Sequence, residues 1–208
     1  IEVNEVFKKY DDATVLDNVS LEIEKGKIYG LVGRNGSGKT VLMKCICGLI
    51  KPTSGEVKVA GKTVGKDVDI PEDIGVIIET PGFIPNYSGF KNLKLLASVR
   101  NKISNEEIRK SMEIVGLEPK SRKHVGKYSL GMRQKLGIAQ AIMEKPKILI
   151  LDEPMNGLDN ESVAVVRKIL KEQAENGATI ILASHNREDI DVLCDKVYTM
   201  DHGVIECE

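Results

Sequence analysis

Apolar and polar residues alternate along the first part of the chain, with the period of two that is typical of half-buried antiparallel strands. Asp11-Asp12 and Asp17-Asn18 are placed to supply turns between such strands, and residues 51–55 form a further turn. These strands are predicted at residues 1–10 and 19–24, and two more strands are predicted at 56–60 and 74–78. We therefore expect an N-terminal antiparallel β subdomain.

Short apolar runs predict a second kind of strand, one that is buried on both faces as in a parallel sheet. These strands are predicted at residues 28–32, 147–151 and 179–183, and each is followed by a helical pattern, at 41–50, 160–175 and 188–194. The alternation of strand and helix indicates an α/β fold with a mostly parallel central sheet.

The chain changes character after Glu79. A loop with two prolines and a glycine covers residues 80–86, and helical patterns follow at 88–100 and, from a Ser104 cap with Glu107 three residues on, through residue 115. A third helix is predicted up to about residue 144, with an apolar side of Leu136, Ile138, Ala139 and Ile142. We expect one domain over 1–208, in which a helical subdomain at about 80–144 is inserted into a body at about 1–79 and 145–208.

Charge and cysteine content narrow the class of protein. The 208 residues carry 30 basic and 31 acidic side chains, so no overall field favours nucleic acid or an anionic membrane. The four cysteines are too few and too scattered for a disulfide framework or a zinc site, which predicts reduced thiols in a cytosolic protein. The sequence has no apolar run of about 18 residues and no signal-peptide pattern, so we expect no membrane span.

The segment between the strand at 28–32 and the helix at 41–50 carries the clearest chemistry. It fits the phosphate-loop pattern G-x-x-x-x-G-K-[ST] with Gly33, Arg34, Asn35, Gly36, Ser37, Gly38, Lys39 and Thr40. Glycines let the backbone N–H groups turn inward, and the following helix N-terminus adds about half a positive charge. We expect these residues and Val41 to bind a polyphosphate, with Lys39 on its β- and γ-phosphates and Thr40 on a shared Mg²⁺.

Other polar groups lie at the ends of predicted strands. Asp152 and Glu153 follow the apolar run at 147–151. Two carboxylates at the end of a buried strand favour a metal site over the alternative, which is a pair of solvated acids in a loop. His185 follows the strand at 179–183, on the edge where parallel sheets bind ligands. Tyr10 ends the first strand, where stacking on a purine and an ordinary strand-end tyrosine are equally compatible with its position.

Taken in order, these features resemble the nucleotide-binding subunit of an ATP-binding-cassette (ABC) transporter over essentially the whole chain. Residues 129–134 are similar to the family signature and residues 156–159 to its dimer-contact loop. The resemblance implies a P-loop NTPase fold and Tyr10 as the aromatic that stacks on adenine. It also implies that Ser129 and Gly131 contact the γ-phosphate of ATP held by a second subunit.

Two departures from the family pattern narrow the resemblance. The signature Leu-Ser-Gly-Gly-Gln is replaced at 128–132 by Tyr-Ser-Leu-Gly-Met, which keeps the serine and the second glycine. Glu79 stands where the family generally has glutamine, so an acceptor-only carboxylate replaces an amide near the metal. Both departures are similar to the bacterial subfamily that confers immunity to lantibiotics and resistance to bacitracin-type peptides. We expect Glu79 to bind Mg²⁺ at the nucleotide, with stronger or differently arranged metal binding.

The resemblance also implies roles and partners. Lys39 and a Mg²⁺ held by Thr40, Asp152 and Glu79 would neutralise charge on the transferred phosphoryl group. Glu153 would polarise the attacking water, and His185 would contact the γ-phosphate. The expected partners are a second nucleotide-binding subunit and a separate transmembrane permease, which would keep the chain on the inner face of the membrane, whereas nucleic acid is not expected.

Two alternatives remain open. The same cassette serves transporters of other substrates, such as drugs, lipids or ions, and soluble proteins of DNA repair, chromosome organisation or translation. Those soluble proteins resemble longer chains with coiled-coil insertions or paired cassettes, whereas this chain has one cassette and no heptad run. The residues favour an ATPase that powers export of, or immunity to, antimicrobial peptides.

Overall fold

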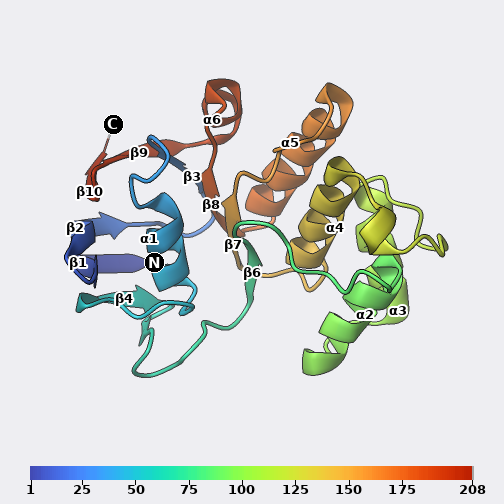
Figure 1. Cartoon of the computed structure of the whole chain (residues 1–208), viewed down its shortest axis with the longest axis horizontal. Coiled ribbons are helices and arrows are strands. Elements are labelled where there is room, and N and C mark those ends of the chain that lie inside the picture. Colours follow the sequence, from blue (N-terminus) through green and yellow to red (C-terminus); the bar gives the residue numbers. More distant parts are fainter. Residues whose placement is uncertain (208) are drawn as a thin grey trace.

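The computed structural model describes residues 1–207 and shows them arranged around a six-stranded sheet (Figure 1). The strand order is β10-β9-β3-β8-β7-β6, and neighbours pair in parallel except for β10, which is antiparallel to β9. The strands are β3 (Ile28–Val32), β6 (Ile74–Ile77), β7 (Ile148–Asp152), β8 (Thr179–Ala183), β9 (Lys196–Asp201) and β10 (Val204–Cys207). The mostly parallel sheet is thus confirmed, and β9 and β10 extend it beyond the predicted strands.

An antiparallel sheet of order β2-β1-β4-β5 packs at one side of the central sheet. Its strands are β1 (Glu2–Tyr10), β2 (Ala13–Glu22), β4 (Ser54–Val59) and β5 (Lys62–Thr63). The turn predicted at Asp17-Asn18 is wrong, because both residues lie inside β2. The register with β1 shifts there, so β2 takes up an extra residue as a β-bulge instead of reversing direction. Asn18 tolerates the φ of +53° that the bulge requires.

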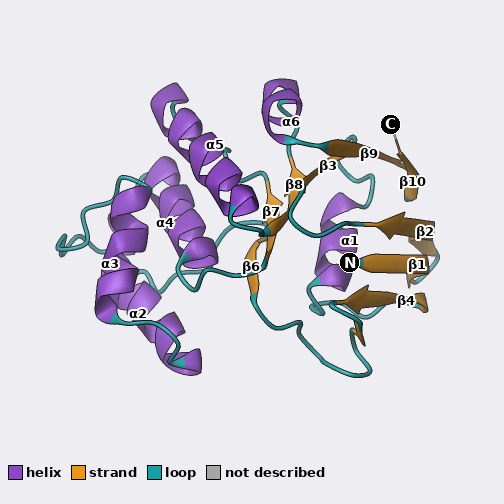
Figure 2. Ribbon diagram, turned by 180° about the vertical axis from the view of Figure 1, so that it is seen from behind, coloured by secondary structure: helices purple, strands orange, loops and turns teal. Residues whose placement is uncertain are grey.

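The helices form two groups, as Figure 2 shows. Helices α1 (Lys39–Ile46), α5 (Asn160–Glu175) and α6 (Arg187–Leu193) flank the sheet, whereas α2 (Gly89–Arg100), α3 (Asn105–Ile114) and α4 (Leu130–Ile142) gather at the end away from β1, with a 3₁₀ turn at Val125–Lys127. The predicted capping box of Ser104 and Glu107 starts α3. Helix α1 ends earlier than predicted because Gly48, with a φ of +77°, leaves the helical conformation. None of the helices within residues 1–207 is long and apolar enough to cross a membrane.

Side chains of the central strands alternate between two hydrophobic cores, which explains their uninterrupted apolar runs. Leu149 and Leu151 of β7 face the core that also contains Leu136 of α4. Ile148 and Ile150 of the same strand face the core that α1 shares with the antiparallel sheet. Neither face of β7 is left for polar residues, so the first polar group of this strand is Asp152, at its end.

Candidate functional site

A cavity of about 480 Å³ opens where the parallel strands β3, β6 and β7 end, the edge at which such sheets bind ligands. Of the predicted site residues, it brings together Asn35, Gly36, Ser37, Gly38, Lys39, Thr40, Val41, Glu79, Asp152 and Glu153. Gly33, Arg34 and His185 line a second cavity. Tyr10, Ser129 and Gly131 line neither of the two.

The phosphate loop encloses its own lysine. Lys39 is only 9% exposed, and its Nζ donates hydrogen bonds to the carbonyl oxygens of Gly33 at 2.7 Å and Arg34 at 3.0 Å. Gly38, the residue before α1, has a φ of +107°, and a Cβ there would lie 2.7 Å from the carbonyl oxygen of Val15. Only glycine fits this position, so the loop is held open around a site for a phosphate group.

The turn between β9 and β10 braces the phosphate loop, although no motif in the sequence predicts this contact. The N–H of Gly203 donates to the carbonyl oxygen of Ser37 at 3.0 Å, and the carbonyl of Gly203 accepts from the N–H of Asp17 at 2.9 Å. A Cβ on Gly33 would clash with the carbonyl of Met200. Three segments that are far apart in sequence therefore meet through backbone hydrogen bonds, which no residue type reveals.

Thr40 and Asp152 meet at the mouth of the loop, where Oγ1 of Thr40 donates to Oδ2 of Asp152 at 2.7 Å. Neighbouring ligands of an octahedral Mg²⁺ lie about 3 Å apart, so these oxygens are already spaced as such a pair. Among residues 1–207, no group of three or more His, Cys, Asp or Glu side chains could hold a metal ion by itself. The residues therefore fit Mg²⁺ in its usual setting, shared between one or two protein oxygens, waters and substrate phosphates.

Glu153 follows directly, and its Oε2 lies 2.7 Å from Nδ1 of His185. Its backbone is left-handed, with a φ of +50°, a strained conformation that the surrounding contacts must hold. The N–H of Glu153 donates to the carbonyl of Ala183 at 2.9 Å, and Nε2 of the buried Gln134 donates to the carbonyls of Glu153 and Pro154. Sequence reasoning did not assign Gln134 to the site, although it is the last residue of the signature-like segment.

Glu79 lies two residues beyond β6, the neighbour of β7, and its side chain pairs with Lys44 of α1 at 2.5 Å. It lines the cavity of Thr40 and Asp152 but makes no hydrogen bond to either of them. Only Oε1 of Glu79 is paired with Lys44, and no contact with the metal-binding oxygens is formed, so the predicted role of Glu79 at the metal ion stays a prediction.

Tyr10 is 44% exposed at the end of β1, and the ammonium of Lys8 lies 4.8 Å from its ring centroid. Because that cation covers part of the ring, stacking on a purine would use the remaining surface. The predicted role of Tyr10 therefore stays open.

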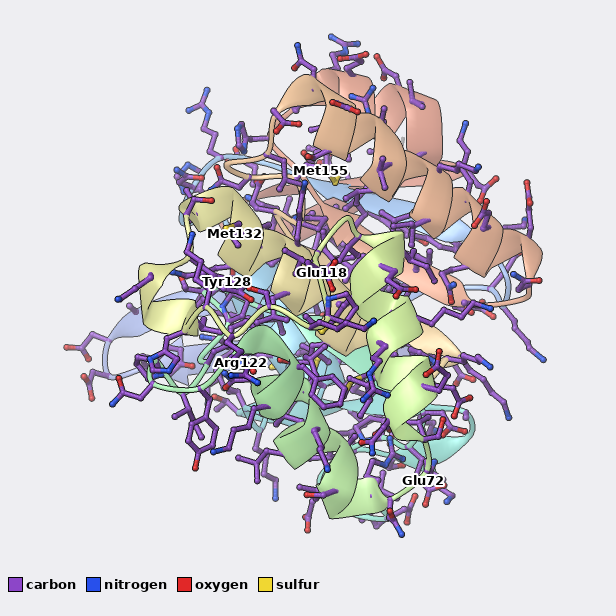
Figure 3. The ribbon with its side chains drawn as sticks, turned by 90° about the vertical axis from the view of Figure 1, so that its right-hand side faces the viewer. Glu72, Glu118, Arg122, Tyr128, Met132 and Met155 are labelled. Carbon is purple, nitrogen blue, oxygen red and sulfur yellow. The ribbon has the colours of Figure 1, made fainter. Side chains whose placement is uncertain are left out.

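The signature-like segment starts α4, and its Leu130, Arg133 and Gln134 line the cavity of the phosphate loop, whereas Ser129 and Gly131 do not. Ser129 is its N-cap, with Oγ accepting from the N–H of Met132 at 3.2 Å, and Leu130 is 58% exposed. In Figure 3, Tyr128 and Met132 mark the start of this helix. A Cβ on Gly131 would lie 2.9 Å from the carbonyl of Gly157, so the segment packs on the loop predicted to contact a second subunit.

Comparison with known proteins agrees with this geometry. A family model described as ABC transporter matches residues 16–156. The chain is 48% identical over 206 residues to the uncharacterized ABC transporter ATP-binding protein YybJ of Bacillus subtilis (strain 168), covering 99% of this chain and 94% of that protein. It is 43% identical to the bacitracin transport ATP-binding protein BcrA of Enterococcus faecalis, with 98% and 67% covered. It is 36% identical to the lantibiotic transport ATP-binding protein SrtF of Streptococcus pyogenes, with 100% and 90% covered.

Among solved structures, the dimeric structure of MJ0796, a bacterial ABC transporter cassette, matches with a TM-score of 0.89 at 23% identity, covering 99% of this chain and 96% of that one. At that identity the match supports the fold. The family model and the relatives show more: the chain belongs to the ABC transporter family, and it is an ATPase of that family.

Proposed function

We propose that this chain hydrolyses ATP to power a transporter that exports antimicrobial peptides of the lantibiotic or bacitracin type, or confers immunity to them. One observation carries the ATPase part: the phosphate loop meets the Thr40–Asp152 and Glu153–His185 pairs at one edge of the sheet. The peptide class is supported by the names of two relatives, a bacitracin and a lantibiotic transport ATP-binding protein.

The phosphate-binding half of the reaction falls to Lys39 and the metal-binding oxygens. The Lys39 ammonium, held by loop carbonyls, can turn to the β- and γ-phosphates once a nucleotide enters. Mg²⁺ would be held by Thr40 and Asp152, with Glu79 as a further ligand, and would supply positive charge opposite the γ-phosphate. Together these groups stabilise the charge that develops when the γ-phosphoryl group leaves.

The water-activating half falls to Glu153 and His185. A carboxylate at the strand end can orient a water molecule and accept its proton, the usual task of a general base. Nδ1 of His185 lies 2.7 Å from Oε2 of that carboxylate, and His185 would also contact the γ-phosphate. The backbone contacts of Glu153 with Ala183 and Gln134 fix the position from which the carboxylate acts.

A second nucleotide-binding subunit would complete the site. Ser129 and Gly131 do not line the cavity of their own phosphate loop, yet they lie at the N-terminus of a 13-residue helix, whose partial positive charge favours an anion. Two subunits related by a two-fold axis could each place this segment against the γ-phosphate held by the other. ATP would then be part of the interface, and its hydrolysis would release the subunits.

A separate permease would dock beside the loop at 80–87. Ile84 is 40% exposed in this loop, and Pro85 is exposed beside it. Phe83 packs against the hydrophobic core instead, and the ring of Tyr87 lies 3.7 Å from the ammonium of Lys91. Ile84 and Pro85 are therefore the apolar side chains that remain free to contact a membrane protein.

Calorimetric titration of the purified protein with ATP, with and without Mg²⁺, and an assay of phosphate release test the ATPase. We expect Mg²⁺-dependent binding and turnover, and no affinity for ATP at millimolar concentration would refute the proposal. For the transport part, purification from membranes should recover a polytopic membrane protein with the chain. Salt-sensitive binding of nucleic acid without such a partner would favour a soluble ATPase instead.

A further inference from the structure

A buried ionic network joins α5, α6 and the residue that follows β8. None of its members has a role in the proposed mechanism. Asp189 of α6 is 1% exposed, and its Oδ1 accepts hydrogen bonds from Nε and Nη2 of Arg167 on α5, at 2.9 and 2.6 Å. Its Oδ2 accepts from Oγ of Ser184 at 3.1 Å. A carboxylate this far from water persists only with such partners, and each of its oxygens accepts at least one hydrogen bond, from the arginine or from the serine.

The network reaches the loop that carries His185. Ser184 precedes His185, and its Oγ also accepts from the N–H of Asn186 at 3.1 Å, so the residues on both sides of the histidine are tied to Asp189. The side chain of His185 is 71% exposed, and its hydrogen bond is to Glu153. Because the side chain is exposed and makes one hydrogen bond, the position of its ring depends mainly on the position of its backbone.

We propose that Asp189 and Arg167 are positioning residues that hold the backbone at 184–186 so that His185 meets Glu153. Neither residue lines the cavity of the phosphate loop. The proposal rests on the role given to His185 and Glu153 above. Its alternative is that the ion pair only packs α6 against α5.

The imidazole signals separate the two alternatives without any ATP. The chain has three histidines, so a two-dimensional NMR spectrum of the ring protons is readily assigned, with His185→Gln identifying the signal of interest. Ser184→Ala removes the link to the loop and leaves the Arg167–Asp189 pair in place. We expect it to move the ring signal of His185 and to leave those of His124 and His202 where they are, because neither contacts the network.

Turnover gives a second readout. Because the phosphate loop holds the nucleotide independently, Ser184→Ala and Asp189→Asn should lower kcat about 10- to 100-fold, the effect of a displaced catalytic group, while KM for ATP changes less than about 2-fold. Glu172→Gln is the matched control. Glu172 lies on α5, the helix of Arg167, and pairs with Lys168 at 3.8 Å. Both side chains are exposed and neither lines the cavity of His185, so neither the His185 signal nor kcat should change.

Either of two results would overturn the proposal: Ser184→Ala leaves the His185 signal and kcat at their wild-type values, or Glu172→Gln changes them as much. If Asp189→Asn fails to fold, the His185 signal and kcat of the Ser184→Ala variant decide between the two alternatives. A wild-type protein without ATPase activity would refute the proposed function, whereas the NMR measurement would still show whether the network places His185.

Discussion

The phosphate loop and the segment that begins α4 are both glycine-containing turns that lead into a helix, yet the chain supports them differently. Lys39 and Ser37 of the loop are buried, and the β9–β10 turn braces the loop through Gly203. At the other turn Ser129 and Leu130 are exposed, and the support comes from the short loop at Gly157. The first turn is fixed by contacts within the chain, whereas the second exposes its serine to solvent.

Under the proposed function, this difference separates the steps that one chain performs from those that need a second chain. Binding a phosphate group requires N–H groups and a cation fixed in advance, and the braced loop provides both. Ser129 faces solvent, so it would contact a phosphate group only when a second subunit brings its bound nucleotide to this segment. We therefore expect substitutions near the phosphate loop to alter ATP binding by a single chain, and substitutions at Ser129 to alter the ATP-dependent dimer.

The largest effect should come from Glu153→Gln, which keeps the shape of the side chain but removes the base. We expect kcat to fall by roughly 10² to 10⁴, the usual share of general-base catalysis, while ATP binding is retained. Steady-state phosphate release and calorimetric binding measure the two quantities. Glu113→Gln, an equal change at an exposed position of α3, is the control, and near-normal turnover of Glu153→Gln would remove Glu153 from this role.

Ser129→Asp tests the exposed half of the comparison. Aspartate caps a helix as well as serine does, so the fold should be kept, but its charge would face the γ-phosphate of the partner. We expect ATP-dependent dimers to weaken by roughly 100-fold in size-exclusion chromatography with light scattering, with ATP binding to the monomer unchanged. Ser88→Asp makes the same change at the N-cap of α2 and should leave the dimer intact. Equal dimerisation of the Ser129→Asp and wild-type proteins would contradict the proposed interface.

Gly203→Ala tests the brace. Gly203 has a φ of +82°, and a Cβ there would lie 2.6 Å from the carbonyl of Val15, so the turn must shift relative to β2, which disturbs its hydrogen bond to Ser37. We expect a loss of about 1–3 kcal/mol in the free energy of unfolding, from strain and the lost contact, and weaker ATP binding. Gly61→Ala has a similar φ of +77° but nothing within 4 Å of the added Cβ. It should lose stability without losing ATP affinity, and equal affinity in the two variants would show that the brace does not shape the loop.

The brace also marks the limit of what the sequence predicts. The phosphate loop, Asp152 and Glu153 are recognisable because their chemistry depends on side chains or glycines at fixed spacing, and the parallel strands because both faces are apolar. The β9–β10 turn acts through the backbone of Gly203, and Gln134 acts through two carbonyl groups, so neither leaves a distinctive pattern. The bulge in β2 was missed for a related reason, since Asp17-Asn18 suits a turn and a bulge equally well.

Glu79→Gln should have the smallest effect, because Glu79 stands at the entrance of the cavity, two-thirds exposed, and its ion pair with Lys44 is worth at most about 1 kcal/mol. If the carboxylate also serves the metal, its loss should raise the Mg²⁺ concentration for half-maximal ATP binding by about 2- to 5-fold, as expected for a free-energy change below about 1 kcal/mol. Lys44→Gln is the informative partner variant, since it frees the carboxylate and should lower that Mg²⁺ concentration. If the two variants shift the half-maximal Mg²⁺ concentration in opposite directions, Glu79 interacts with both Lys44 and the metal. If both variants shift it in the same direction, Glu79 acts only through its ion pair with Lys44. Unchanged Mg²⁺ dependence of the Glu79→Gln variant, together with unchanged peptide resistance in cells, would show that this carboxylate is dispensable.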